Sequence, residues 1–67
     1  MFERIGEIAR NNWGCRMSFG ELAGELGLRS AWHAGQQVGA AWRYFNRRHD
    51  AYTCSAISRM FWAKGRC

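Results

Sequence analysis

The chain has 67 residues, of which 48% are hydrophobic and 15% aromatic, and its formal net charge is +5. This length restricts it to a single domain covering residues 1–67, and the hydrophobic fraction excludes an intrinsically disordered chain. No apolar run approaches the roughly 20 residues of a membrane-spanning helix, and the charged start MFERIGEIAR does not resemble a signal peptide. We therefore expect a cytoplasmic protein without a membrane partner.

The three cysteines, Cys15, Cys54 and Cys67, are an odd number and do not form the paired pattern of a secreted disulfide framework. We expect free thiols, with Cys67 exposed at the terminus. Together with His33 and His49, these residues show none of the ligand spacings that are typical of metal sites. The sequence therefore predicts no metal and no cofactor.

The charges are unevenly distributed along the chain. Residues 1–25 hold three arginines and four glutamates, whereas residues 26–67 hold seven basic residues against Asp50 alone. Nine of the ten basic residues are arginine, whose planar, forked group suits phosphates and guanine. The basic half indicates a surface that faces a polyanion. A merely solubilising surface is the alternative.

Residues 2–12 are predicted to form a first helix. Its apolar residues recur at helical spacing on one face: Phe2, Ile5, Ile8 and Ala9. The pair Asn11-Asn12 and the following Gly14 end the pattern. We expect this helix to pack in the core.

A second, short helix is the most completely specified element. Ser18 is a good N-cap, and Glu21 three residues later completes a capping box. Gly27 supplies the left-handed residue that ends the helix. Gly20 and Gly24, inside the helix, are expected to permit a close approach of the following helix.

A longer helix is predicted to begin at Ser30, a second N-cap candidate, and to run to about Arg47. Its inward stripe is apolar: Ala31, Ala34, Val38, Ala41, Trp42 and Phe45. Its opposite face is mostly polar: His33, Gln36, Gln37, Ala40, Arg43 and Arg47. A short capped helix, a tight turn and a longer helix form a helix-turn-helix layout.

The last stretch, AYTCSAISRMFWAKGRC, changes in composition. Its aromatic and β-branched residues favour extended structure, and residues 63–66 look like a basic turn. We interpret it as a short strand and turn, although a short helix over residues 54–62 fits the apolar spacing as well. The expected fold is mostly α (α+β): a three-helix helix-turn-helix core with a short C-terminal β wing.

The run Ser-Phe-Gly-Glu-Leu-Ala at residues 18–23 is followed by Leu26-Gly27, Ala34 and Val38-Gly39. This pattern resembles winged helix-turn-helix domains, among them the DNA-binding half of the alkylguanine-DNA alkyltransferases and their alkyltransferase-like relatives. It is also similar to small helix-turn-helix modules of phage and bacterial regulators. The resemblance covers residues 17–59 and implies that the helix from Ser30 is a recognition helix for double-stranded DNA.

The resemblance also implies which residues contact DNA. Polar residues at the start of the recognition helix would face bases, and basic residues on its flank and on the wing would bind phosphates. The first group is Arg29, Ser30, His33, Gln36 and Gln37; the flank has Arg43, Arg47 and Arg48; the wing has Arg59, Lys64 and Arg66. A small basic DNA-binding protein, a transcriptional regulator of phage or mobile-element type, is expected. A solvated polar face is the alternative.

The remaining alternatives are catalysis and protein binding. The alkyltransferase nucleophile lies in a Pro-Cys-His-Arg run, but Cys54 is flanked by Thr53 and Ser55 and lacks an activating base. No catalytic residue is therefore predicted, and the chain is not expected to be an enzyme. Large aromatic residues such as Trp32 and Trp62 exceed what so small a core buries. An exposed aromatic patch would favour a homodimer, or an inhibitor or adaptor that binds a host protein target.

Overall fold

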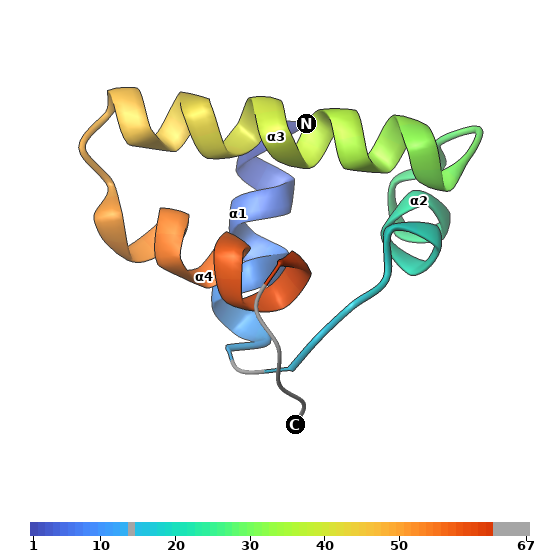
Figure 1. Cartoon of the computed structure of the whole chain (residues 1–67), viewed down its shortest axis with the longest axis horizontal. Helices are drawn as coiled ribbons and strands as arrows, with labels where there is room; N and C mark the ends of the chain where they lie inside the picture. The colour runs from blue at the N-terminus through green and yellow to red at the C-terminus, as the bar shows by residue number, and fades with distance from the viewer. Residues whose placement is uncertain (14, 63–67) are drawn as a thin grey trace.

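The structure, a computed structural model, describes residues 1–13 and 15–62 (Figure 1). Within these residues it contains four helices and no β-strand: α1 (Phe2–Asn11), α2 (Phe19–Leu26), α3 (Ala31–Arg47) and α4 (Ala51–Phe61). α1 packs against both α3 and α4, α3 packs against α4, and α2 packs against α3. Figure 1 shows α1, α2 and α4 all on one side of the long α3.

The predicted β wing is wrong, because residues 51–61 form a helix. Asp50 caps α4 by accepting the Thr53 N–H at Oδ1 over 3.0 Å. The residues that α4 buries recur at helical spacing: Thr53, Cys54, Ala56, Ile57, Met60 and Phe61. Packing of this face against α1 and α3 overrides the β-propensity of the individual residues. The fold in the described part of the chain is therefore all-α. The alternative helix over 54–62 has the correct type but starts three residues late, and the basic turn at 63–66 lies outside the described residues.

The three other helices agree with the sequence prediction. The capping box of α2 is present: the Glu21 N–H donates to Ser18 Oγ over 3.1 Å, and the Ser18 N–H donates to Glu21 Oε1 over 3.0 Å. The hydrogen bond from the Ser18 N–H to the carboxylate is the largest cause that lowers the pKa of Glu21. Gly27 is left-handed at φ 69° and ends α2, and Ser30 caps α3. Caps and turn residues therefore fix these helix ends as predicted.

The expected role of Gly20 and Gly24 is wrong. A Cβ at Gly24 would meet no atom within 4 Å, and one at Gly20 would meet only Ser18 Oγ at 3.8 Å. The close approach occurs instead in α1, where a Cβ at Gly6 would lie 2.6 Å from Phe45 Cζ and 3.0 Å from Thr53 Cγ2. The absence of a side chain at Gly6 is what lets α1 cross α3 and α4 closely.

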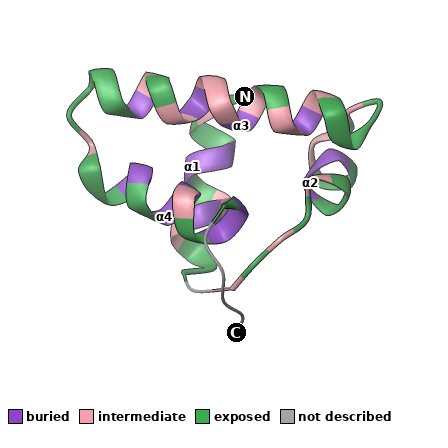
Figure 2. Ribbon diagram, viewed as in Figure 1, coloured by how far each residue is buried: buried purple, intermediate pink, exposed green. Residues whose placement is uncertain are grey.

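One hydrophobic core joins the four helices, and Figure 2 shows buried residues, in purple, on each of them. Its members are Ile5, Ala9, Leu22, Ala23, Ala34, Val38, Ala41, Phe45, Cys54, Ala56, Ile57, Met60 and Phe61. The aromatic rings of Phe19 and Phe61 stack at a centroid distance of 5.6 Å and connect α2 to α4.

A polar connection fixes α4 to the end of α1. Arg10 Nη1 donates to Thr53 Oγ1 over 2.8 Å, and the Thr53 hydroxyl donates to Asp50 Oδ2 over 2.7 Å. The backbone N–H of Thr53 is the largest cause that lowers the pKa of Asp50. Asp50 is therefore engaged within the fold, although it is the sole acidic residue after Glu25.

The cysteines differ from one another. Cys54 is a buried free thiol, as expected. Cys15 is disulfide-bonded, so the expectation of a free thiol there is wrong. Cys67 lies outside the described residues. In residues 1–13 and 15–62, no helix has the length and apolar character needed to cross a bilayer.

Candidate nucleic-acid interface

The face of α3 that points away from the core is open. Ala34, Val38, Ala41 and Phe45 point inward and are buried. On the opposite side four exposed residues form what we call the outer stripe: Trp32, Gln36, Arg43 and Arg47. At 100° per residue they fall within a sector of about 60°. All four side chains are exposed, although Phe2 of α1 lines a shallow hollow together with Arg43 and Arg47.

The polar side chains of the outer stripe have no partner within the fold. Gln36, Arg43 and Arg47 form no hydrogen bond or ion pair with another residue in the described ranges. α3 contains no acidic residue that could compete for them. Between Gln36 and Arg43, a Cβ at Gly39 would meet nothing within 4 Å. The stripe is thus cationic towards its C-terminal end, and in its middle Gly39 has no side chain that projects from the helix.

The start of α3 holds three further predicted contacts. Ser30 accepts the His33 N–H over 3.4 Å, and its Oγ lies 2.8 Å from His33 Nδ1. The His33 ring meets the Trp32 ring edge-on at 5.1 Å. Ser30 therefore acts as the helix cap, half-buried His33 supports Trp32, and Arg29 is exposed in the turn before them. Ala31, expected on the inward stripe, is exposed.

Arg48 and Gln37 do not belong to the outer stripe. Arg48 Nη1 donates to Tyr44 Oη over 2.9 Å, and the Tyr44 hydroxyl donates to Glu3 Oε2 over 2.8 Å. The hydrogen bond to the Glu3 carboxylate raises the pKa of Tyr44. Arg48 thus helps to hold the end of α3 to α1, and Gln37 is half-buried on the flank of α3.

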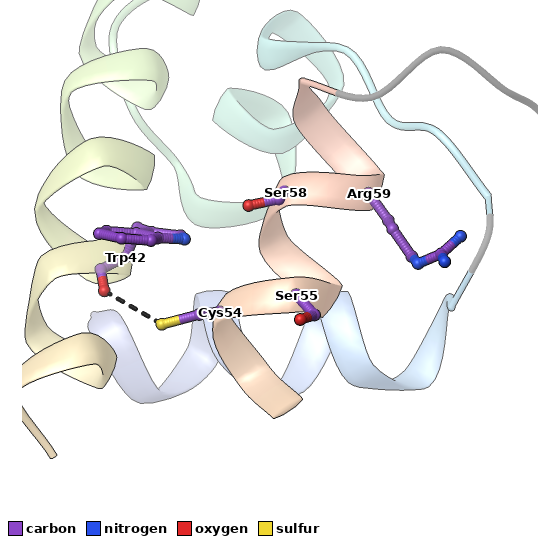
Figure 3. A pocket seen from close by; sticks show the side chains of 5 residues that line it. All are labelled: Trp42, Cys54, Ser55, Ser58 and Arg59. Carbon is purple, nitrogen blue, oxygen red and sulfur yellow. Dashed lines mark hydrogen bonds between the residues drawn. The ribbon is translucent and has the colours of Figure 1, made fainter. Parts of the chain in front are cut away.

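Arg59, the described residue of the three assigned to the wing, does not belong to the outer stripe either. Arg59 lies on α4 with its guanidinium 5.1 Å from the centre of the Trp13 ring, which stacks in parallel on Tyr52. Figure 3 shows Arg59 pointing away from Trp42 of α3. Lys64 and Arg66 lie outside the described residues.

A groove between α3 and α4 could not be predicted from the sequence, because it exists only when residues 51–61 form a helix. It consists of two cavities of about 440 and about 470 Å³ that share Trp42 and Ser58. Figure 3 shows the side chains that line the first of them. Cys54 lines the first cavity and donates its thiol to the Trp42 carbonyl over 3.4 Å. Burial raises the pKa of the Cys54 thiol, which keeps it protonated at neutral pH.

The acidic residues are concentrated in the first two helices. Four of the five acidic residues lie on α1 and α2, and the fifth, Asp50, is engaged with Thr53. In the described part of the chain, no three His, Cys, Asp or Glu side chains gather closely enough to hold a metal ion. The outer stripe therefore lies on a helix that contains no acidic residue.

Comparison with known proteins assigns no family to the chain. No family model, no curated protein and no solved structure matches it. The resemblance to helix-turn-helix domains therefore stays a prediction from the sequence.

Proposed function

We propose that this chain binds double-stranded DNA by placing the outer stripe of α3 in the major groove. The observation that carries this proposal is a row of exposed side chains on an acid-free helix face: Trp32, Gln36, Arg43 and Arg47. The three polar members of this row have no hydrogen-bond or ion-pair partner in the described residues. The major groove, about 12 Å wide, admits an α-helix. Because α3 has 17 residues and extends over about 25 Å, one half enters the groove while the other crosses the phosphate backbone.

The two halves of α3 have different roles in this arrangement. Gln36 lies in the N-terminal half, where a carboxamide can contact a base edge. Arg43 and Arg47 lie about two and three turns further towards the C-terminus and bind phosphates. α2 supports the N-terminal end of α3, and the turn over residues 27–30 joins them in the order that a helix-turn-helix requires. The protein would act in the cytoplasm as a small transcriptional regulator of phage or mobile-element type.

A salt titration with matched variants tests the proposal. Arg43→Ala/Arg47→Ala and Arg4→Ala/Arg16→Ala each remove two exposed, unpartnered arginines, so both variants have the same net charge. Each phosphate contact contributes about 0.9 to the slope of log K against log salt concentration. We expect the α3 variant to lower this slope by about two for a blunt duplex, measured by fluorescence anisotropy. The control variant should keep the wild-type slope. An equal decrease of this slope in both variants would show an effect of net charge alone and contradict the proposal.

A protein-binding function is the second candidate, and the exposed aromatic residues favour it. Trp32 is 68% exposed, Tyr52 58% and Trp62 50%. Association with a host protein target, or with a second copy of the chain, would be insensitive to salt and would weaken in Trp62→Ala. DNA binding would be sensitive to salt and unaffected by that substitution, because Trp62 lies outside the outer stripe.

A further inference from the structure

The N-terminal half of α3 presents only uncharged groups. Residues 30–42 contain no Arg, Lys, Asp or Glu. Within this range, the outward positions of the stripe are occupied by Trp32 and Gln36, with Gly39 and Ala40 beside them. Ser30 and His33 are engaged with each other at the helix cap. The groups that this half of the outer stripe offers to base edges are therefore the Gln36 carboxamide and the Trp32 ring.

The chemistry of the base edges makes this composition selective. In the major groove, guanine is read by Arg or Lys and cytosine by a carboxylate, whereas adenine is read by Asn or Gln and the thymine methyl group by apolar side chains. Residues 30–42 contain neither the Arg or Lys that would read guanine nor the carboxylate that would read cytosine. We infer that α3 selects A·T base pairs, with Gln36 reading adenine and Trp32 contacting a thymine methyl group. This inference rests on the DNA-binding function proposed above.

The geometry of the two side chains supports the assignment. Trp32 and Gln36 are one helical turn apart, about 6 Å along the axis, which corresponds to about two base-pair steps of 3.4 Å. The Gln36 carboxamide has no hydrogen-bond partner in the described part of the chain, so both of its groups are available to adenine N6 and N7. The Trp32 ring is held by the edge-on contact with His33, which Ser30 in turn fixes. Gln36 and Trp32 are thus both exposed, and the contact with His33 orients the Trp32 ring before DNA binds.

The basic residues of α3 do not oppose this selectivity. Arg43 lies seven residues beyond Gln36, about 10 Å along the axis, and Arg29 precedes the helix. Neither arginine lies between Trp32 and Gln36. Gly39 and Ala40 are small, so they let the helix approach the groove at the position of Gln36.

The test uses four blunt duplexes of equal length, titrated with the whole protein by fluorescence anisotropy. They are an A·T-rich duplex, the same duplex with deoxyuridine for thymidine, the same with 7-deazaadenine for adenine, and a G·C-rich duplex. Deoxyuridine removes only the methyl group, which lies in the major groove, and 7-deazaadenine removes the N7 acceptor there. We expect the A·T-rich duplex to bind at least about tenfold more tightly than the G·C-rich one. Deoxyuridine should weaken binding about fourfold for each buried methyl group.

Two variants assign the effects to residues. Trp32→Ala should lose the sensitivity to deoxyuridine, and Gln36→Ala should lose the sensitivity to 7-deazaadenine. Arg16→Ala, on the link between α1 and α2, should keep both. Equal affinity of the wild type for all four duplexes overturns the selectivity of α3 and leaves DNA binding intact. No binding to any duplex at low salt overturns the DNA-binding function itself.

Discussion

Gly6 is the position where the packing of α1 against α3 and α4 can be tested most severely. In Gly6→Ala the new Cβ would lie 2.6 Å from Phe45 Cζ, 2.8 Å from Phe45 Cε2 and 3.0 Å from Thr53 Cγ2. Carbon atoms in favourable contact are about 3.5–4.0 Å apart, so the Phe45 ring would have to move by about 1 Å. Phe45 is 3% exposed and Thr53 1% exposed. Neither side chain has free space to move into.

The expected magnitude follows from two opposing contributions. Overpacking of a well-packed core costs about 1–3 kcal/mol, whereas replacing glycine by alanine inside a helix gains about 0.5–1 kcal/mol. The upper part of the overpacking range applies here, because Thr53 is also fixed by Arg10 and Asp50. We therefore expect a net loss of about 1–2 kcal/mol, which for a domain of this size lowers Tm by about 4–16 °C.

The assay is thermal unfolding followed by circular dichroism, with Gly24→Ala as the matched control. Gly24 is in α2 with no atom near its missing Cβ, so the same substitution should stabilise the protein by up to about 1 kcal/mol. In a double-mutant cycle, Phe45→Leu should cost less in the Gly6→Ala background than in the wild type, because the smaller side chain relieves the clash. A Gly6→Ala variant as stable as the wild type would refute the packing of α1 described above.

Two further predictions concern the helix ends. His49 has φ 60°, and His49→Gly should stabilise the protein by about 0.5–1 kcal/mol in thermal unfolding because glycine adopts this left-handed conformation without strain. His49→Ala should not stabilise it, and an equal gain from both substitutions would argue against the left-handed conformation. The pKa of Asp50 is lowered by the Thr53 N–H, so the capping contribution is present at neutral pH and is lost as the pH falls through the lowered pKa. Asp50→Ala should therefore lower Tm at neutral pH and converge with the wild type in acid, whereas a constant difference in Tm would exclude this linkage.

Helix ends could be predicted from the sequence because their signals are local. Ser18, Glu21 and Gly27 form hydrogen bonds and turns with residues a few positions away, and these contacts are present in the structure. The type of the segment 51–61 could not be predicted in this way. Its helix depends on the cap by Asp50 and on burial against α1 and α3, and propensity alone does not reveal such distant contacts. The tight contact at Gly6 was missed for the same reason.

The candidate site was predictable only as far as helical periodicity extends. Gln36, Arg43 and Arg47 fall on one face because they share a helix, and that face is open as expected. The position of Arg48 depends on Tyr44 and Glu3, which lies more than 40 residues away in the sequence. The position of Arg59 depends on Trp13 and on α4 being a helix. Long-range packing therefore separates these two arginines from the outer stripe.

The most direct test of the central claim, that DNA lies against the outer stripe of α3, is an NMR titration of the whole protein with a blunt duplex. The indole N–H groups of Trp13 and Trp32 report on different surfaces, because Trp13 stacks on Tyr52 of α4 and Trp32 lies on the outer stripe. We expect the Trp32 indole resonance to shift most, together with the Gln36 side-chain amide and the Gly39 backbone amide, while Trp13 stays unchanged. Shifts centred on Trp13, with Trp32 and Gln36 unaffected, would contradict the claim.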